Sequence, residues 1–302
     1  MESKSGNDDL WPSLPLEEWK DTYATLHMWT QIVGKIRLVQ SPRVNHWWQV
    51  PLYVSARGLT TSAIPYKGRS FEIDFDFIDH QLIINTSDGR REVIQLEPRS
   101  VADFYQQVTK SLGSLEIDVK INARPDEVPN PIPFAEDHEH ASYDPQYVNR
   151  FWRILLQAER VFTEFRSRFI GKCSPVHFFW GSFDLAVTRF SGRPAPEREG
   201  ADLITREAYS HEVISHGFWP GSGNVTAAAY YAYAAPEPAG FSKETIHPAS
   251  AFYNPETSGF ILLHDDVRQA DSPDEALLSF MQSTYEAGAN LAKWDRATLE
   301  RR

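Results

Sequence analysis

Apolar residues recur along the chain in two rhythms, and these predict both helices and strands. A spacing of three to four residues places apolar side chains on one face of a helix, and it predicts helices over residues 16–38 and 147–170. In residues 71–77, apolar side chains alternate strictly with acidic ones, as in a strand with one buried face. Similar or shorter runs predict further strands at residues 49–56, 82–85, 91–96, 115–121, 209–218, 227–234 and 260–263.

Two more helices are predicted from their first residues. Ser100 stands three positions before Asp103 and opens an apolar pattern that runs to Leu112, which indicates a capped helix. Ser272 is followed by a first-turn Pro273 and by Glu275, which predicts a helix with a capping box. Each of these helices comes directly after a predicted strand, so both parts of the chain have the order helix, strands, helix.

Two segments of the chain also resemble each other. Residues 45–58 and 176–189 each place a histidine and two aromatic residues before an alternating apolar strand, after a long predicted helix. We therefore predict an α+β fold of two pseudo-symmetric helix/strands/helix halves, with mostly antiparallel sheet packed against helices and a cleft where the halves meet. The expected organisation is a flexible tail at 1–14, a first half at 15–122, a Pro-rich acidic linker at 123–146, and a second half at 147–296 that forms one compact unit with the first.

Composition limits the class of partner. The 302 residues carry a net charge of −11 and contain no block of Lys and Arg, which argues against nucleic acid and anionic membrane surfaces as partners. Cys173 is the only cysteine, so an internal disulfide and a cysteine-rich zinc site are excluded. We expect a cytoplasmic protein, because we find no signal-peptide pattern in the sequence and no apolar run of membrane-spanning length. The oligomeric state stays open.

Three stretches of the sequence carry a family resemblance. They are residues 45–54 (NHWWQVPLYV), residues 183–193 (FDLAVTRFSGR), and Ser210–Val213 with the following Gly217–Gly221. In these stretches the chain resembles an uncharacterised bacterial family known only as a domain of unknown function, DUF5996. The resemblance extends from about Trp11 to Trp294 and implies no established chemistry, so no functional residue is transferred from it.

Asp184 is the leading candidate for a functional side chain. Along its predicted strand it lies on the face opposite Phe183, Leu185 and Val187. If Arg189 or Arg193 pairs with it, the pair suits a small anionic or polyol ligand, because a guanidinium binds carboxylate or phosphate through two parallel hydrogen bonds. A purely structural ion pair is the alternative.

His211 and Glu212 are the candidate proton-transfer pair. His211 and His216 are five residues apart, which does not fit the four-residue spacing of a helical zinc-protease motif. We expect His211, Glu212 and Asp184 to be catalytic if the site is catalytic. The alternative is a hydrogen-bonded His–Glu pair that only stabilises the fold.

The remaining candidates would line a ring-walled pocket. Nine Trp are present, and Trp180 and Trp219 are expected to form walls, with His46 and His177 at the mouth and Arg189 holding a ligand anion. No cofactor is expected. A divalent metal at His138 and His140 is the weaker alternative, as is one on the acidic strand face of residues 72–76.

The sequence therefore favours a small-molecule enzyme or binder for a polar or anionic ligand, with its cleft in the second half. Dinucleotide and phosphate-binding glycine motifs and a serine nucleophile elbow are not found in the sequence. The competing class is a non-catalytic protein-interaction or self-association module, in which surface Trp and Tyr form the contact.

Overall fold

The chain folds as an α+β protein with two antiparallel sheets. The structure is a computed structural model, and it describes residues 10–222 and 225–301. The helices among them are α2 (Leu16–Gln40), α3 (Val101–Ser114), α4 (Pro145–Ser167), α5 (Leu203–Ala208), α6 (His264–Arg268), α7 (Pro273–Leu291) and α8 (Arg296–Leu299). Short 3₁₀ turns are η1 (Asn45–Trp47), η2 (Phe134–Glu136) and η3 (Phe241–Lys243).

The first sheet has the strand order β1-β2-β4-β5-β6, with β3 paired to part of β4. All of its pairs are antiparallel. Its strands are β1 (Tyr53–Ser55), β2 (Gly58–Thr60), β3 (Ile64–Tyr66), β4 (Arg69–Asp76), β5 (Gln81–Thr86) and β6 (Arg91–Gln95).

The second sheet has the order β11-β12-β10-β9-β8-β7 and is also antiparallel throughout. Its strands are β7 (His177–Phe179), β8 (Asp184–Pro194), β9 (His211–Trp219), β10 (Ala229–Ala235), β11 (Phe252–Asn254) and β12 (Gly259–Leu263).

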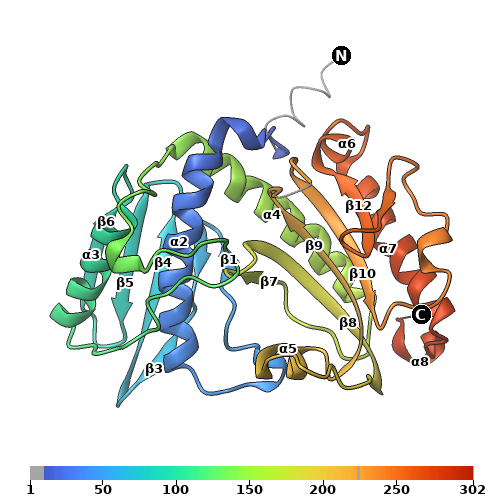
Figure 1. The fold of residues 1–302 in the computed structure, drawn as a ribbon, viewed down its shortest axis with the longest axis horizontal. Coiled ribbons are helices and arrows are strands. Elements are labelled where there is room, and N and C mark those ends of the chain that lie inside the picture. The colour runs from blue at the N-terminus through green and yellow to red at the C-terminus, as the bar shows by residue number, and fades with distance from the viewer. Residues whose placement is uncertain (1–9, 223–224, 302) are drawn as a thin grey trace.

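The long helices α4 and α7 cover one face of the second sheet. α4 contacts β8, and α7 contacts β9 and β10, so that both lie on the same side of these strands (Figure 1). Alternation along β8 sends Leu185 and Val187 into the core beneath the helices, and both are fully buried. Asp184, Ala186 and Thr188 face the other way, onto the side of the sheet that these helices leave open.

The two sheets meet at their edge strands. Leu52, just before β1, and Phe178 of β7 exchange two backbone hydrogen bonds of 2.9 Å. α4 contacts β1 as well as β8 and so spans this junction, while α2 lies between the two sheets (Figure 1). One continuous hydrophobic core contains buried residues from Trp11 to Trp294.

Most of the predicted elements are confirmed, with ends shifted by a few residues. Ser100 caps α3 as predicted, because its side chain accepts a hydrogen bond of 3.1 Å from the Asp103 amide. Ser272 precedes α7 but its side chain makes no capping hydrogen bond, so that part of the prediction is wrong. The strand predicted at 115–121 is also wrong: Leu115 and Ile117 are buried, yet the segment pairs with no strand.

The pseudo-symmetry of the two halves is not confirmed. In the second segment His177–Phe179 forms strand β7, whereas the corresponding histidine and tryptophan of the first lie in η1. His46 and Trp47 there have φ values of 56° and 59°, a left-handed backbone outside the extended region of a regular strand. The similar residue pattern is therefore built into two different local structures.

Across residues 10–222 and 225–301, no helix has both the length and the apolar character needed to cross a bilayer.

Candidate binding pocket on the open face of the second sheet

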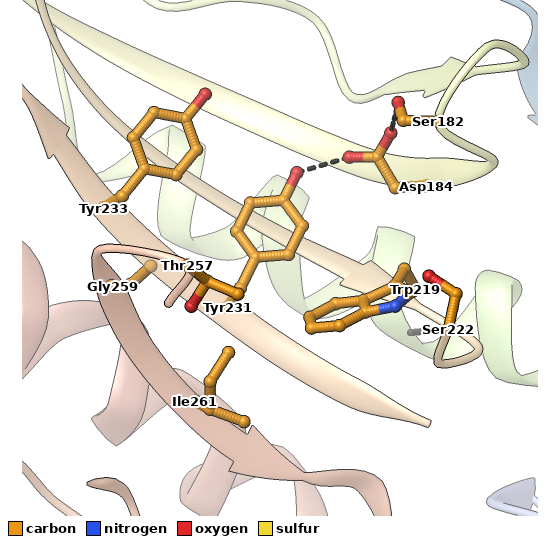
Figure 2. A pocket seen from close by; sticks show the side chains of 10 residues that line it. Ser182, Asp184, Trp219, Ser222, Tyr231, Tyr233, Thr257, Gly259 and Ile261 are labelled. Atoms are coloured by element: carbon orange, nitrogen blue, oxygen red, sulfur yellow. Dashed lines mark hydrogen bonds between the residues drawn. The ribbon is translucent and has the colours of Figure 1, made fainter. Parts of the chain in front are cut away.

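A cavity of about 640 Å³ lies over the open face of the second sheet. Its floor is formed by β8, β9 and β10, and its cover by η1, residues 126–127 and residues 202–209, which include α5. The side chains that line it include Trp48, Glu127, Trp180, Asp184, Thr188, Asp202, Tyr209, Ser215, Tyr231 and Tyr233. A second hollow of about 320 Å³ shares Asp184 and Tyr231 with it and extends to Trp219 (Figure 2).

Asp184 is the polar centre of this pocket. It begins β8, and only 8% of its surface is exposed. Its two carboxylate oxygens accept hydrogen bonds from different hydroxyl groups, those of Ser182 and Tyr231 (Figure 2). Burial raises the pKa of Asp184 above its ordinary value, and the two hydroxyl donors oppose that rise by stabilising the charged form.

The Tyr231 ring reaches Asp184 across the intervening strand because Gly217 leaves room for it. Gly217 lies opposite Tyr231 in the β9–β10 pairing. A Cβ at this position would lie 2.2 Å from the Tyr231 ring and 2.5 Å from the Leu185 carbonyl oxygen, so any larger residue displaces one or the other. The glycine thus fixes where the tyrosine hydroxyl points.

Trp180 is held rigidly in the pocket wall. Its indole packs directly on α2 at Gly34, where an added Cβ would lie 2.2 Å from the ring. Its Nε1 donates a 2.8 Å hydrogen bond to the Val50 carbonyl. Tyr209 and Tyr233 close another side, with their hydroxyl groups 2.8 Å apart.

The cover adds carboxylates to the pocket. Gln31 of α2 holds the 126–127 segment through bonds of 2.8 and 2.9 Å to the Asp126 backbone. Glu127 is thereby placed at the pocket mouth, where desolvation and the negative charge of Asp184 raise its pKa. Asp202 also lines the pocket, but its carboxylate caps α5 by accepting bonds from the Ile204 and Thr205 amides.

Four of the sequence-predicted site residues lie at these hollows: Asp184, Trp180 and His46 line the larger one, and Trp219 the smaller. His46 Nδ1 donates to the Glu207 carbonyl at 3.0 Å, so Nε2 accepts the 2.6 Å bond from Lys172. Burial and the nearby Lys172 charge lower the pKa of His46, which favours its neutral form.

The structure places Arg189 on the opposite face of the sheet. The side chain is 1% exposed, and its guanidinium lies 3.4 Å from the Phe165 ring centre and 4.3 Å from that of Tyr285. Burial lowers its pKa to about 10, and it donates to the Phe165 carbonyl. It does not pair with Asp184, and it is not available to a ligand in the pocket.

The predicted His211–Glu212 pair is also separated, because neighbouring residues of β9 point to opposite faces. Glu212 forms an ion pair of 2.6 Å with Arg193. His211 stays on the pocket side, with its ring 5.7 Å from that of His46. His177 is buried beneath Trp48 and stacked on Phe179, outside the cavity lining.

The part of the chain that the structure describes contains no group of three or more metal-ligating side chains. His140 instead pairs with the buried Asp137 at 2.8 Å.

Tyr231, Tyr233 and Glu127 were not singled out from the sequence. For the two tyrosines a signal existed, because residues two apart on a strand share a face. A glycine inside the β9 pattern was a second signal, since it often marks the close approach of another group. Glu127 lies in the irregular 123–146 segment, where no periodicity indicates which side chains turn inward.

The molecule is thus an α+β protein with an aromatic, acidic pocket on one face of an antiparallel sheet. The chain belongs to a family of unknown function, DUF5996, whose model matches residues 11–301. Neither a search of curated proteins nor a search of solved structures finds a match.

Proposed function

We propose that the protein binds a small organic molecule in the pocket, with Asp184 as its polar anchor. The observation that carries this proposal is the combination of a cavity of about 640 Å³, walls made largely of aromatic rings, and one buried carboxylate. Small-molecule sites characteristically have such a concave, mostly apolar lining with a few polar groups that fix the orientation of the ligand. The supporting residues Gly34 and Gly217 hold two of the rings in place, which favours a preformed site.

The distribution of rings favours a ligand over a protein partner. All nine Trp and twelve Tyr lie in the described residues, and none of them is exposed. The three Trp that are only half-buried, Trp47, Trp48 and Trp219, line the two hollows. A self-association or protein-binding surface built from these rings would need them on the outside.

Filling the cavity tests the proposal. Thr188 is half-buried on the pocket floor, so Thr188→Phe should occupy ligand space, whereas Thr188→Val keeps the volume. Wild type is screened by thermal shift against a metabolite library, and hits are measured by titration calorimetry. We expect at least one hit that Thr188→Val retains and Thr188→Phe loses. The proposal fails if nothing binds, or if every hit binds Thr188→Phe as it binds wild type.

A further inference from the structure

Some carboxylates around the pocket are held by an ion pair or a helix end, and others are not. Asp126 forms an ion pair with Lys35, and the Asp202 carboxylate is used as the cap of α5. Among residues 10–222 and 225–301, Asp184 and Glu127 have no cation within ion-pair distance. These two carboxylates lie close enough for Asp184 to raise the pKa of Glu127. When ionised, Asp184 and Glu127 thus bring negative charge to the pocket that no ion pair in the described residues compensates.

Lys172, a cation beside the pocket wall, already has partners within that wall. Lys172 donates to His46 at 2.6 Å and lies over the rings of Trp48 and Phe190, 5.4 and 4.9 Å from their centres. Its amine is not among the groups that line the cavity. It therefore gives an incoming anion no free positive charge.

A buried carboxylate without a counter-ion is costly, and hydroxyl donors reduce that cost without cancelling the charge. Ser182 and Tyr231 supply one neutral donor to each oxygen of Asp184, and each oxygen keeps a lone pair for another donor. An ammonium group fits this position, since it brings both a positive charge and N–H donors.

The aromatic walls of the pocket also favour a cationic ligand. The faces of Trp and Tyr rings carry negative electrostatic potential and attract organic cations. Tyr231 and Tyr233 line the cavity that contains Asp184, as do Trp48 and Trp180, whose rings already lie near Lys172 and Lys35. Carboxylate and rings therefore favour the same ligand charge, and both disfavour an anion.

We infer that the ligand of this pocket is a small organic cation, whose ammonium group pairs with Asp184 and whose body lies among the aromatic rings. The inference rests on the proposed function and specifies its ligand class. It replaces the polar or anionic ligand expected from the sequence, because the arginine on which the anion depended lies on the other face of the sheet.

Three probes that share an indole ring and differ mainly in charge test the inference. Tryptamine is cationic, tryptophol neutral and indole-3-acetate anionic, and the binding of each is measured by titration calorimetry. We expect tryptamine to bind wild type about tenfold more tightly than either of the others. Equal affinities, tighter binding of the anion, or no binding of tryptamine would overturn the inference.

The role of Asp184 is tested by Asp184→Asn, which removes the charge and keeps the shape. Tryptamine affinity should fall about tenfold while tryptophol affinity stays unchanged. Glu212→Gln is the matched control, because it removes one negative charge from the opposite face of the same sheet. If Glu212→Gln weakens tryptamine as much as Asp184→Asn does, only the net charge matters and the inference fails. Circular dichroism confirms that both variants are folded.

The experiment separates the two proposals. If the hits that Thr188→Phe abolishes are neutral or anionic, the pocket is a binding site and the cation inference is wrong. If tryptamine prefers wild type over Asp184→Asn but binds Thr188→Phe equally well, the cation lies outside the cavity. In that case the proposed function fails as well.

Discussion

The hydroxyl group of Tyr231 donates a hydrogen bond to the carboxylate of Asp184 from two strands away (Figure 2). Tyr231 belongs to β10 and Asp184 to β8, so the ring must cross β9 to make the bond. The ring crosses β9 at Gly217, because only glycine leaves room for the ring at this position. Three strands are therefore needed to place one buried carboxylate and its donor.

The first prediction concerns this crossing. Gly217→Ala should destabilise the protein by about 1–3 kcal/mol, because the new methyl group collides with the Tyr231 ring and the Leu185 carbonyl. Gly113→Ala in α3 is the control, since a Cβ there meets nothing within 4 Å. Free energies of unfolding in urea measure both variants. Equal stability of Gly217→Ala and wild type would show that the ring does not lie over this strand.

The periodicity of the sequence predicted elements well wherever a segment faces the common core. The alternation at 71–77 became β4, and the helical spacing at 147–170 became α4. The failure at 115–121 has a physical reason: alternation reports which side chains are buried, and Leu115 and Ile117 are indeed buried. It does not report whether a neighbouring strand offers hydrogen bonds, and Glu116 has a left-handed φ of 57°, outside the extended region of a regular strand.

For the site, the same alternation already indicates the face of the sheet on which Arg189 lies. Arg189 is an even number of residues from Leu185 and Val187, so a strand through them places it on their buried face, away from Asp184. The contact between Tyr231 and Asp184 could not be predicted from the sequence, because it depends on the pairing register of three strands. The position of Glu127 depends on how Gln31 holds an irregular segment, which no local pattern encodes.

The second prediction separates structure from binding at Arg189. Arg189→Ala should destabilise the fold by about 2–4 kcal/mol, because it empties a buried space among Phe165, Phe169 and Tyr285. Arg189→Met should cost less, since it fills most of that space. Both variants should bind the pocket ligand with wild-type affinity under native conditions. A loss of ligand binding in stable Arg189→Met would instead place this residue in the site.

The third prediction concerns acid stability and His216. Burial lowers the pKa of this fully buried histidine to about 3 from an ordinary 6.5. The unfolded chain binds the proton first, so the stability present above pH 6.5 is lost as the pH falls toward the folded-state pKa. In that window the unfolding free energy of wild type should fall more steeply than that of His216→Gln, by about 1.4 kcal/mol per pH unit.

Urea unfolding at a series of pH values measures this slope. The exposed His138 provides the control, and His138→Gln should reproduce the wild-type curve. Parallel curves for wild type and His216→Gln would show that this histidine binds its proton over the same pH range in the folded and unfolded states.

The fourth prediction has the opposite sign and concerns Asp184. Its pKa is raised by burial above the ordinary 3.8, so the folded state holds the proton more tightly than the unfolded state does. The resulting stability is complete below pH 3.8 and is lost as the pH rises through the folded-state pKa. Relative to wild type, Asp184→Asn should therefore gain stability across that window and keep the gain at higher pH.

A bound cation should stabilise wild type more than it stabilises Asp184→Asn. When Asp184 is ionised, tryptamine at a concentration about 100 times its Kd should stabilise wild type by about 2.7 kcal/mol. Asp184→Asn at the same concentration should gain only about 1.4 kcal/mol, because its tenfold weaker affinity makes that concentration about 10 times its own Kd. Thermal and urea unfolding with and without tryptamine measure the difference. If the ligand stabilises both proteins equally, the charge of Asp184 contributes nothing to binding, and the cost of burying it has no functional counterpart.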